Sequence, residues 1–158
     1  MKKTLIILWF AAISSAAFAQ EKRAVHWLTF EQLSDSLTVR PKPVLLFFHT
    51  DWCAYCRKML ADVFTNPAIA EKLNDDYYAV QFDAESIDTV YFDGQILRNE
   101  HGRKQTGKYH DIAKILAARN GDFAFPTTLL LQPDFRVQRR YFEYIGPQKL
   151  LKALRDVE

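Results

Sequence analysis

An apolar run from Pro43 to His49 precedes two closely spaced cysteines, in the segment Cys53-Ala54-Tyr55-Cys56. A short continuous apolar run is typical of a strand that is buried on both faces of a central sheet. Residues 53–64 then have the pattern of a helix, whose core-facing side chains are Met59, Leu60, Val63 and Phe64. The sequence therefore predicts a buried strand that leads into a helix with a cysteine at its first position.

The expected position of Cys53 at a helix N-terminus has chemical consequences. Unpaired N–H groups and the positive end of the helix dipole favour a thiolate there and lower the pKa of the thiol. Cys56 lies one turn further on, where it can attack a mixed disulfide formed on Cys53. A disulfide between the two closes so short a loop that it stabilises the fold little. We therefore interpret the two cysteines as a redox pair.

Two other uses of paired cysteines are less well supported. Haem attachment requires a histidine after the second cysteine, but Arg57 occupies that position. A zinc site requires two further ligands, and none of the four histidines repeats the usual ligand spacing. Zinc binding stays a weaker alternative, and we expect neither a metal nor any other cofactor.

The first nineteen residues have the features of a secretory signal. Lys2 and Lys3 precede an apolar run, and Ala17-Phe18-Ala19 places small residues at the two positions that a signal peptidase reads. The run from Leu5 to Ala19 is shorter than the roughly 20 residues of a membrane-spanning helix. The sequence thus predicts a cleaved signal peptide over 1–19 and one periplasmic or secreted domain over 20–158.

Charge composition bears on the partners of this domain. The chain has 21 basic and 19 acidic side chains, and the basic excess is due to Lys2 and Lys3 in the predicted signal. A neutral domain lacks the concentrated basic face that nucleic acid binding requires, so we expect no nucleic acid partner.

Exported proteins reside in oxidising compartments, where a thiol pair is either a structural disulfide or a working redox couple.

The rest of the chain alternates between strand and helix signals. A capping box at Thr29–Gln32 begins a helix to about Leu37, and Asn66-Pro67 begins another to about Leu73. Strands are expected at 27–28, 78–82, 127–131 and 137–144, and a final helix at 148–157.

A long insertion, at about 86–121, separates two of these strands. Asp93-Gly94 between apolar residues predicts a hairpin over 90–97, and a helix over 111–119 is expected to be capped by Gly121. Two interpretations of the insertion stay open: it packs near the active-site edge and affects partner choice, or it is an extra layer without substrate contact. We expect residues 98–108 and the arginines at 136, 139 and 140 to be solvated.

The order of these motifs resembles the thioredoxin fold. The motifs are an apolar strand, Trp52-Cys53-x-x-Cys56, a later Phe125-Pro126-Thr127 before another apolar strand, a hairpin and a final helix. The resemblance covers roughly residues 25–157 and implies an α/β fold, a central mixed sheet flanked by helices, with the insertion before the Pro126 strand. The chain is most similar to exported bacterial thiol:disulfide interchange proteins, including the C-terminal thioredoxin-like domain of the membrane thiol:disulfide transporter.

The resemblance also implies roles for individual residues. Cys53 would attack, Cys56 would resolve, and Trp52 and a cis-Pro126 would support the site. We expect a substrate-binding rim of Tyr55, Phe125 and Thr127. We expect His49, at the end of the apolar strand, to be a packed sheet-end histidine rather than a general base.

Two departures from the family pattern affect the chemistry. Thioredoxins usually carry a buried aspartate where this chain has Phe47, and the lysine that pairs with it corresponds to Gln81. The aspartate and the lysine are both absent, which is energetically reasonable because either one alone would be an unpaired buried charge. In their place Asp83, Glu85 or water could deprotonate Cys56. Ala54 and Tyr55 place no histidine beside the thiolate, so we expect a reducing pair rather than a strong oxidant.

The sequence therefore predicts an exported, monomeric thiol:disulfide oxidoreductase. Its partners would be proteins that contain disulfides, together with a membrane or soluble electron donor. The alternative is a redox-inactive binding or chaperone module with a structural disulfide between Cys53 and Cys56.

Overall fold

The computed structural model describes residues 24–156, which form a central five-stranded sheet of order β1-β3-β2-β8-β9. The strands are β1 (Trp27–Leu28), β2 (Val44–His49), β3 (Tyr78–Asp83), β8 (Thr127–Leu131) and β9 (Val137–Tyr141). β1 and β2 run parallel to β3, whereas β8 is antiparallel to both β2 and β9. The sheet is therefore mixed, as predicted. The predicted signal peptide over 1–19 lies outside the described residues.

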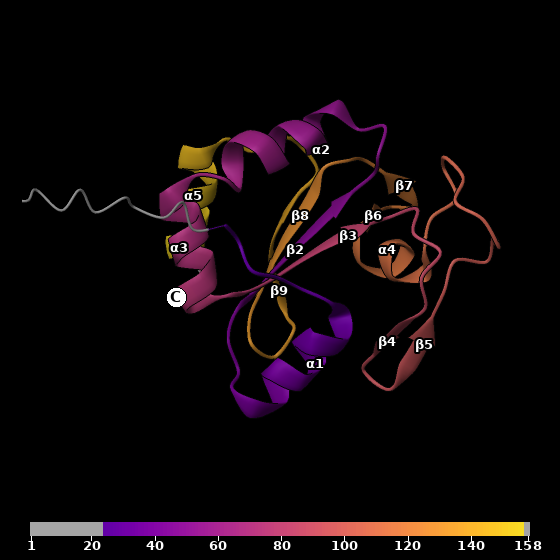
Figure 1. Cartoon of the computed structure of the whole chain (residues 1–158), viewed down its shortest axis with the longest axis horizontal. Coiled ribbons are helices and arrows are strands. Elements are labelled where there is room, and N and C mark those ends of the chain that lie inside the picture. Colours follow the sequence, from indigo (N-terminus) through magenta and orange to yellow (C-terminus); the bar gives the residue numbers. More distant parts are fainter. Residues whose placement is uncertain (1–23, 157–158) are drawn as a thin grey trace, which may run out of the picture.

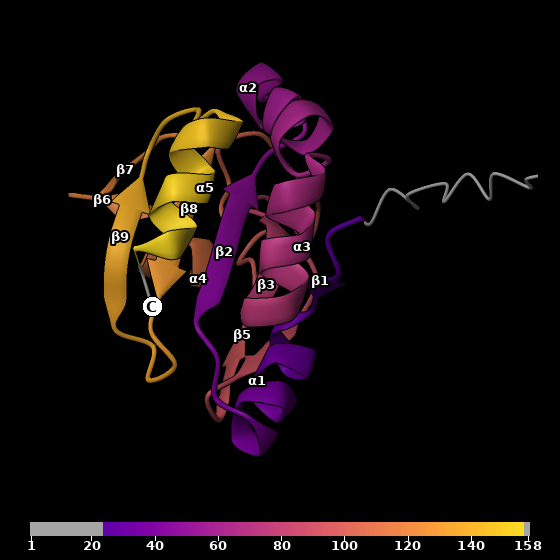
Figure 2. The same ribbon diagram turned by 90° about the vertical axis from the view of Figure 1, so that its left-hand side faces the viewer.

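Helices cover both faces of this sheet (Figure 1). They are α1 (Phe30–Val39), α2 (Ala54–Lys58), the π-helical η1 (Met59–Val63), α3 (Pro67–Asp76), α4 (Asp111–Leu116) and α5 (Pro147–Arg155). Figures 1 and 2 show α3 and α5 side by side on one face, with α1 and α4 on the other. The fold is thus the α/β thioredoxin fold that the motif order implied. No helix within residues 24–156 is long and apolar enough to span a membrane.

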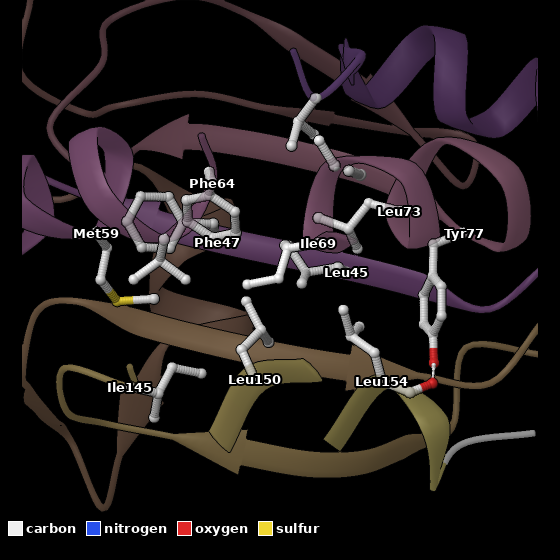
Figure 3. Close-up of a cluster of buried hydrophobic side chains, with 14 of the residues drawn as sticks. Leu45, Phe47, Met59, Phe64, Ile69, Leu73, Tyr77, Ile145, Leu150 and Leu154 are labelled. Carbon is white, nitrogen blue, oxygen red and sulfur yellow. Dashed lines mark hydrogen bonds between the residues drawn. The ribbon is translucent and has the colours of Figure 1, made fainter. Parts of the chain in front are cut away.

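Strand β2 separates two apolar cores because its side chains alternate between the faces of the sheet. Leu45 and Phe47 belong to the core beneath α2, α3 and α5, whereas Leu46 and Phe48 belong to the core beneath α1 and α4. Figure 3 shows the first core, in which helix residues pack onto Leu45 and Phe47. The prediction that this strand is buried on both faces is confirmed.

The predicted helix starts are also confirmed. The Thr29 hydroxyl accepts the Gln32 N–H while the Gln32 side chain accepts the Thr29 N–H, so the capping box is complete. The Asn66 side chain accepts the N–H groups of Ala68 and Ile69, and Pro67 is the first residue of α3. Such caps satisfy N–H groups that have no partner within the helix.

The insertion contains one predicted hairpin and one that was not predicted. Strands β4 (Val90–Phe92) and β5 (Gln95–Leu97) pair across Asp93-Gly94, and both turn residues have positive φ. The prediction of a helix over 111–119 capped by Gly121 is wrong, because α4 ends at Leu116. Strands β6 (Ala118–Arg119) and β7 (Asp122–Phe123) instead pair across Asn120-Gly121, whose positive φ values suit a tight hairpin turn.

Candidate active site

The two cysteines form a disulfide at the start of α2. Their Sγ atoms are 2.09 Å apart and their Cα atoms 5.2 Å apart. Cys53 is the N-cap of α2, and its Sγ accepts the N–H of Cys56 at 3.1 Å. The helix therefore directs the Cys56 N–H at the sulfur of Cys53, and such a donor stabilises a thiolate.

Apolar rings pack next to the disulfide on the inside of the molecule. Phe47 is fully buried in the same core as both cysteines, with its ring 4.9 Å from Phe64 and 6.4 Å from Trp27. Phe47 is paired in register with Gln81 on β3. The two positions at which the resemblance implies a buried acid and a lysine are thus neighbours in the sheet, and an aromatic ring and a neutral amide occupy them.

Trp52 is held in place by a buried carboxylate. Its indole Nε1 donates to Glu85 Oε1 at 3.0 Å, and the Gly107 N–H donates to the same oxygen at 2.6 Å. Glu85 is buried, whereas Trp52 is 51% exposed. The Trp52 ring also meets Phe125 edge to face, with 6.3 Å between centroids. Trp52 therefore lies beside the helix start, and Glu85 connects it to the insertion.

A cluster of charges lies at the edge of the site. Lys104 of the insertion forms ion pairs with both Asp51 and Asp83. Burial opposes the charge of Lys104, but the contacts with the two carboxylates outweigh it and raise the pKa of the ammonium group. The hydrogen bond from Lys104 lowers the pKa of Asp51. Lys104 and Gly107 are exposed, as predicted for residues 98–108, but they also contact carboxylates at the edge of the site.

His49 lies at the end of β2, paired in register with Asp83. Its ring stacks on Phe47 at 5.7 Å. Burial lowers the pKa of His49 below its ordinary value, although Asp83 and Asp51 oppose this effect. These contacts are those of a packed sheet-end histidine.

The predicted rim residues differ in their exposure. Tyr55 is 63% exposed, with its ring 6.2 Å from that of Tyr144. Phe125 is partly buried, and its peptide bond to Pro126 is cis, as the resemblance implied. Thr127 is fully buried, and its hydroxyl donates to the Ala124 carbonyl. The Thr127 side chain therefore exposes no surface to a substrate, and its hydrogen bond helps to fix the start of β8.

Several contacts of the site leave no signal in the local sequence. Lys104 lies 53 residues after Asp51, and Gly107 lies 22 residues after Glu85. Tyr109 of the insertion reaches Phe125, with 5.4 Å between ring centroids. The sequence predicted a hairpin and a helix within the insertion, but no local pattern indicated that Lys104, Gly107 and Tyr109 would reach the site.

Among residues 24–156, no group of three or more histidine, cysteine, aspartate or glutamate side chains is arranged to hold a metal ion. The reactive groups that the geometry brings together are the two cysteine sulfurs.

Comparison with known sequences gives one family and one curated relative. The model of a thioredoxin-like domain matches residues 33–158. Over 68 residues the chain is 34% identical to the thiol:disulfide interchange protein DsbD of Vibrio vulnificus (strain YJ016). That match covers 41% of this chain and 11% of DsbD, so the chain spans only a small part of this relative's length.

Solved structures share the fold at low sequence identity. A thioredoxin from Thermus thermophilus is 18% identical with a TM-score of 0.61, and the match covers 85% of this chain and 87% of that one. The reduced C-terminal domain of Neisseria meningitidis DsbD is 16% identical with a TM-score of 0.52, and the coverage is 80% and 90%. The arrangement of strands and helices is therefore similar to that of thioredoxins.

Proposed function

The chain belongs to the thioredoxin-like domain family and has the paired cysteines of a thiol:disulfide oxidoreductase, and from this premise we propose that it reduces or exchanges disulfides of partner proteins in the periplasm. The observation that carries this proposal is the Cys53–Cys56 disulfide at the N-terminus of α2. The signal features of residues 1–19 support export.

The proposed reaction begins from the reduced pair. The Cys53 thiolate attacks one sulfur of a substrate disulfide, and the other substrate sulfur leaves as a thiolate that takes up a proton. Cys56 then loses its proton and attacks the Cys53 sulfur of the mixed disulfide, which releases the second substrate thiol. Two electrons pass to the substrate, and the 53–56 disulfide of the present structure is the oxidised product.

The two cysteines are suited to different steps. Cys53 receives an N–H at the helix start, which favours a nucleophilic thiolate, and it is followed by exposed Ala54 and Tyr55. Both cysteines are buried, with Cys53 4% and Cys56 1% exposed, but Cys56 lies one turn further into the helix, so it meets the mixed disulfide on Cys53 rather than a substrate in solution. Tyr55 and Phe125 flank the pair as the contacts for a substrate chain.

Turnover requires a source of two electrons, which a membrane or soluble dithiol donor supplies. The name of the Vibrio relative, a thiol:disulfide interchange protein, supports such an exchange between proteins. No histidine lies between the cysteines of this chain, which supports a reducing rather than a strongly oxidising pair.

The proposal is tested by measuring the reduction potential of the pair against glutathione, together with the reduction of insulin disulfides by dithiothreitol. We expect the wild-type protein to accelerate insulin reduction and Cys53→Ser to abolish the acceleration. Cys56→Ser should still attack and should therefore accumulate a mixed disulfide, visible as a covalent adduct by mass spectrometry.

Two results would overturn the assignment. A potential far below that of the periplasm, with no insulin reduction, would indicate a structural disulfide in a binding or chaperone module. Stoichiometric zinc in the purified protein, lost on Cys53→Ser, would indicate a metal site.

A further inference from the structure

The insertion is bound at two points to the short loop that precedes Cys53. Lys104 pairs with Asp51, two residues before the cysteine, and also with Asp83 at the end of β3. Three residues after Lys104, the Gly107 N–H shares the Glu85 carboxylate with the Trp52 indole. Segment 104–109 is therefore anchored to both residues that lead into the dithiol.

Aromatic contacts continue from this segment to the active site. Tyr109 lies 4.2 Å from Phe123 and 5.4 Å from Phe125, measured between ring centroids. Phe125 in turn meets Trp52 at 6.3 Å and precedes the cis-proline. The insertion thus extends, without interruption, the aromatic surface that begins at the exposed Trp52.

We infer that segment 104–109 is one wall of the substrate-binding surface, where it selects polypeptides that carry an apolar side chain next to their disulfide. This inference rests on the proposed function. An aromatic surface continuous with Trp52 gains contact area from an apolar neighbour of the attacked cysteine and gains little from a polar one. A small disulfide reagent, which has no flanking chain, does not use this wall.

Lys104 and Glu85 act in this scheme as positioning residues. Lys104 forms ion pairs with Asp51 and Asp83, and Glu85 accepts hydrogen bonds from Trp52 and Gly107. The partners of these two side chains are thus the residues around the dithiol and not its sulfur atoms. Removal of either anchor frees the wall and leaves the helix N-terminus at Cys53 unchanged. The effect must therefore appear in substrate selection rather than in the reactivity of the thiolate.

The experiment compares Lys104→Met with Lys114→Met. Lys114 is a matched control because it belongs to the same insertion and also contacts two carboxylates, Asp111 and Glu100, away from Asp51 and Trp52. Three substrates are used: two disulfide peptides that differ only in Phe or Ser beside the attacked cysteine, and a bis(thionitrobenzoate) reagent. The pKa of Cys53 is measured in parallel from the pH dependence of its alkylation.

We expect the wild-type protein and Lys114→Met to prefer the Phe peptide. Lys104→Met should lose about tenfold in kcat/KM with that peptide, in the range of one apolar specificity contact, and change less than about twofold with the other two substrates. Lys104→Arg, which keeps the charge and reach, should restore the preference. Glu85→Leu, which removes the acceptor of both N–H groups, should repeat the loss with the Phe peptide alone, and Glu85→Gln should not. An equal loss with all three substrates would instead make Glu85 the base for Cys56 and would overturn its role as a positioning residue.

Different failures have different meanings. Equal selectivity of Lys104→Met and the wild type would overturn the inference, and so would an equal loss with all three substrates and a raised pKa of Cys53, because Lys104 would then act on the thiolate. A wild-type protein that reduces the small reagent but shows no preference between the peptides would also overturn it. A wild-type protein inactive on all three would instead refute the proposed function.

Discussion

The dithiol has an apolar side and a charged side. On the inner side, the rings of Phe47 and Phe64 pack in the core that contains both cysteines. On the outer edge, Lys104 joins Asp51 and Asp83. Phe47 and Gln81 stand at the positions where the resemblance to thioredoxins implies a buried charged pair, while charges gather at the edge where the insertion docks.

The two sides of the dithiol should contribute differently to the stability of the fold and to the binding of a partner. Removal of a buried aromatic side chain costs about 3–5 kcal/mol, whereas a solvent-exposed ion pair contributes about 0–1 kcal/mol. The inner side should therefore determine the stability of the fold, and the outer edge should determine how a partner is held. The first and last predictions below each change one side and leave the other intact.

The largest effect is expected from Phe47→Asp. The new carboxylate would be buried beside Gln81, which has no positive charge to pair with it. We expect the free energy of unfolding at pH 7 to fall by at least about 3–5 kcal/mol, the cost of an uncompensated buried charge. Urea unfolding of the oxidised protein, followed by circular dichroism, measures this loss.

A double-mutant cycle sharpens this result. Gln81→Lys alone places a lysine beside an aromatic ring, and Phe47→Asp/Gln81→Lys restores a potential ion pair at neighbouring register positions. The double variant should be more stable than the sum of the single changes predicts. If Phe47→Asp loses less than about 1 kcal/mol, the inner side tolerates charge and the contrast between the two sides is lost.

The sequence predicts the inner side far better than the outer edge. The run from Pro43 to His49, the capping box at Thr29 and the cysteine spacing are local patterns, and local patterns determine strands and helix starts. Lys104 meets Asp51 across 53 residues, so its partner depends on how the insertion folds back. The prediction that Gly121 caps a helix failed for a different reason, since a glycine that follows a helix can form either a helix cap or a hairpin turn.

The second prediction concerns a buried histidine of the insertion. His110 Nδ1 accepts the Ile112 N–H at 3.1 Å, so its Nε2 carries the proton and donates to the Asp88 carbonyl at 2.9 Å. The neutral ring satisfies both contacts, and burial lowers the pKa of His110 below its ordinary value. The unfolded chain therefore takes up this proton first as the pH falls.

Stability should accordingly decrease as the pH falls below about 6.5, the ordinary histidine value, toward the lowered pKa of the folded state. His49 contributes in the same direction because its pKa is also lowered. We expect His110→Asn, which keeps a side-chain acceptor at the helix start, to lose less stability than the wild type between pH 7.5 and 5.5. His26→Asn, at an exposed position, is the control, and equal pH dependence of all three proteins would contradict the assignment.

The smallest effect on stability is expected from Lys104→Met. The Asp51 side chain is 73% exposed and the Lys104 side chain 39%, while Asp83, the second partner of Lys104, is 18% exposed, so the loss should stay near about 1 kcal/mol. The lowered pKa of Asp51 means that this contribution is present above its ordinary value of 3.8 and disappears as the pH falls through the lowered value. Urea unfolding at pH 7 should show a small difference from the wild type that shrinks in 1 M salt.

A loss above about 2 kcal/mol for Lys104→Met, unchanged by salt, would place the outer edge among the stabilising elements of the fold. A small loss together with a changed preference between peptides would separate the two sides of the dithiol by function. Removal of Lys104 would then lower the free energy of unfolding only slightly, although Lys104 positions the surface that a substrate meets. Charge at the edge and rings beneath the cysteines would thus serve recognition and stability separately.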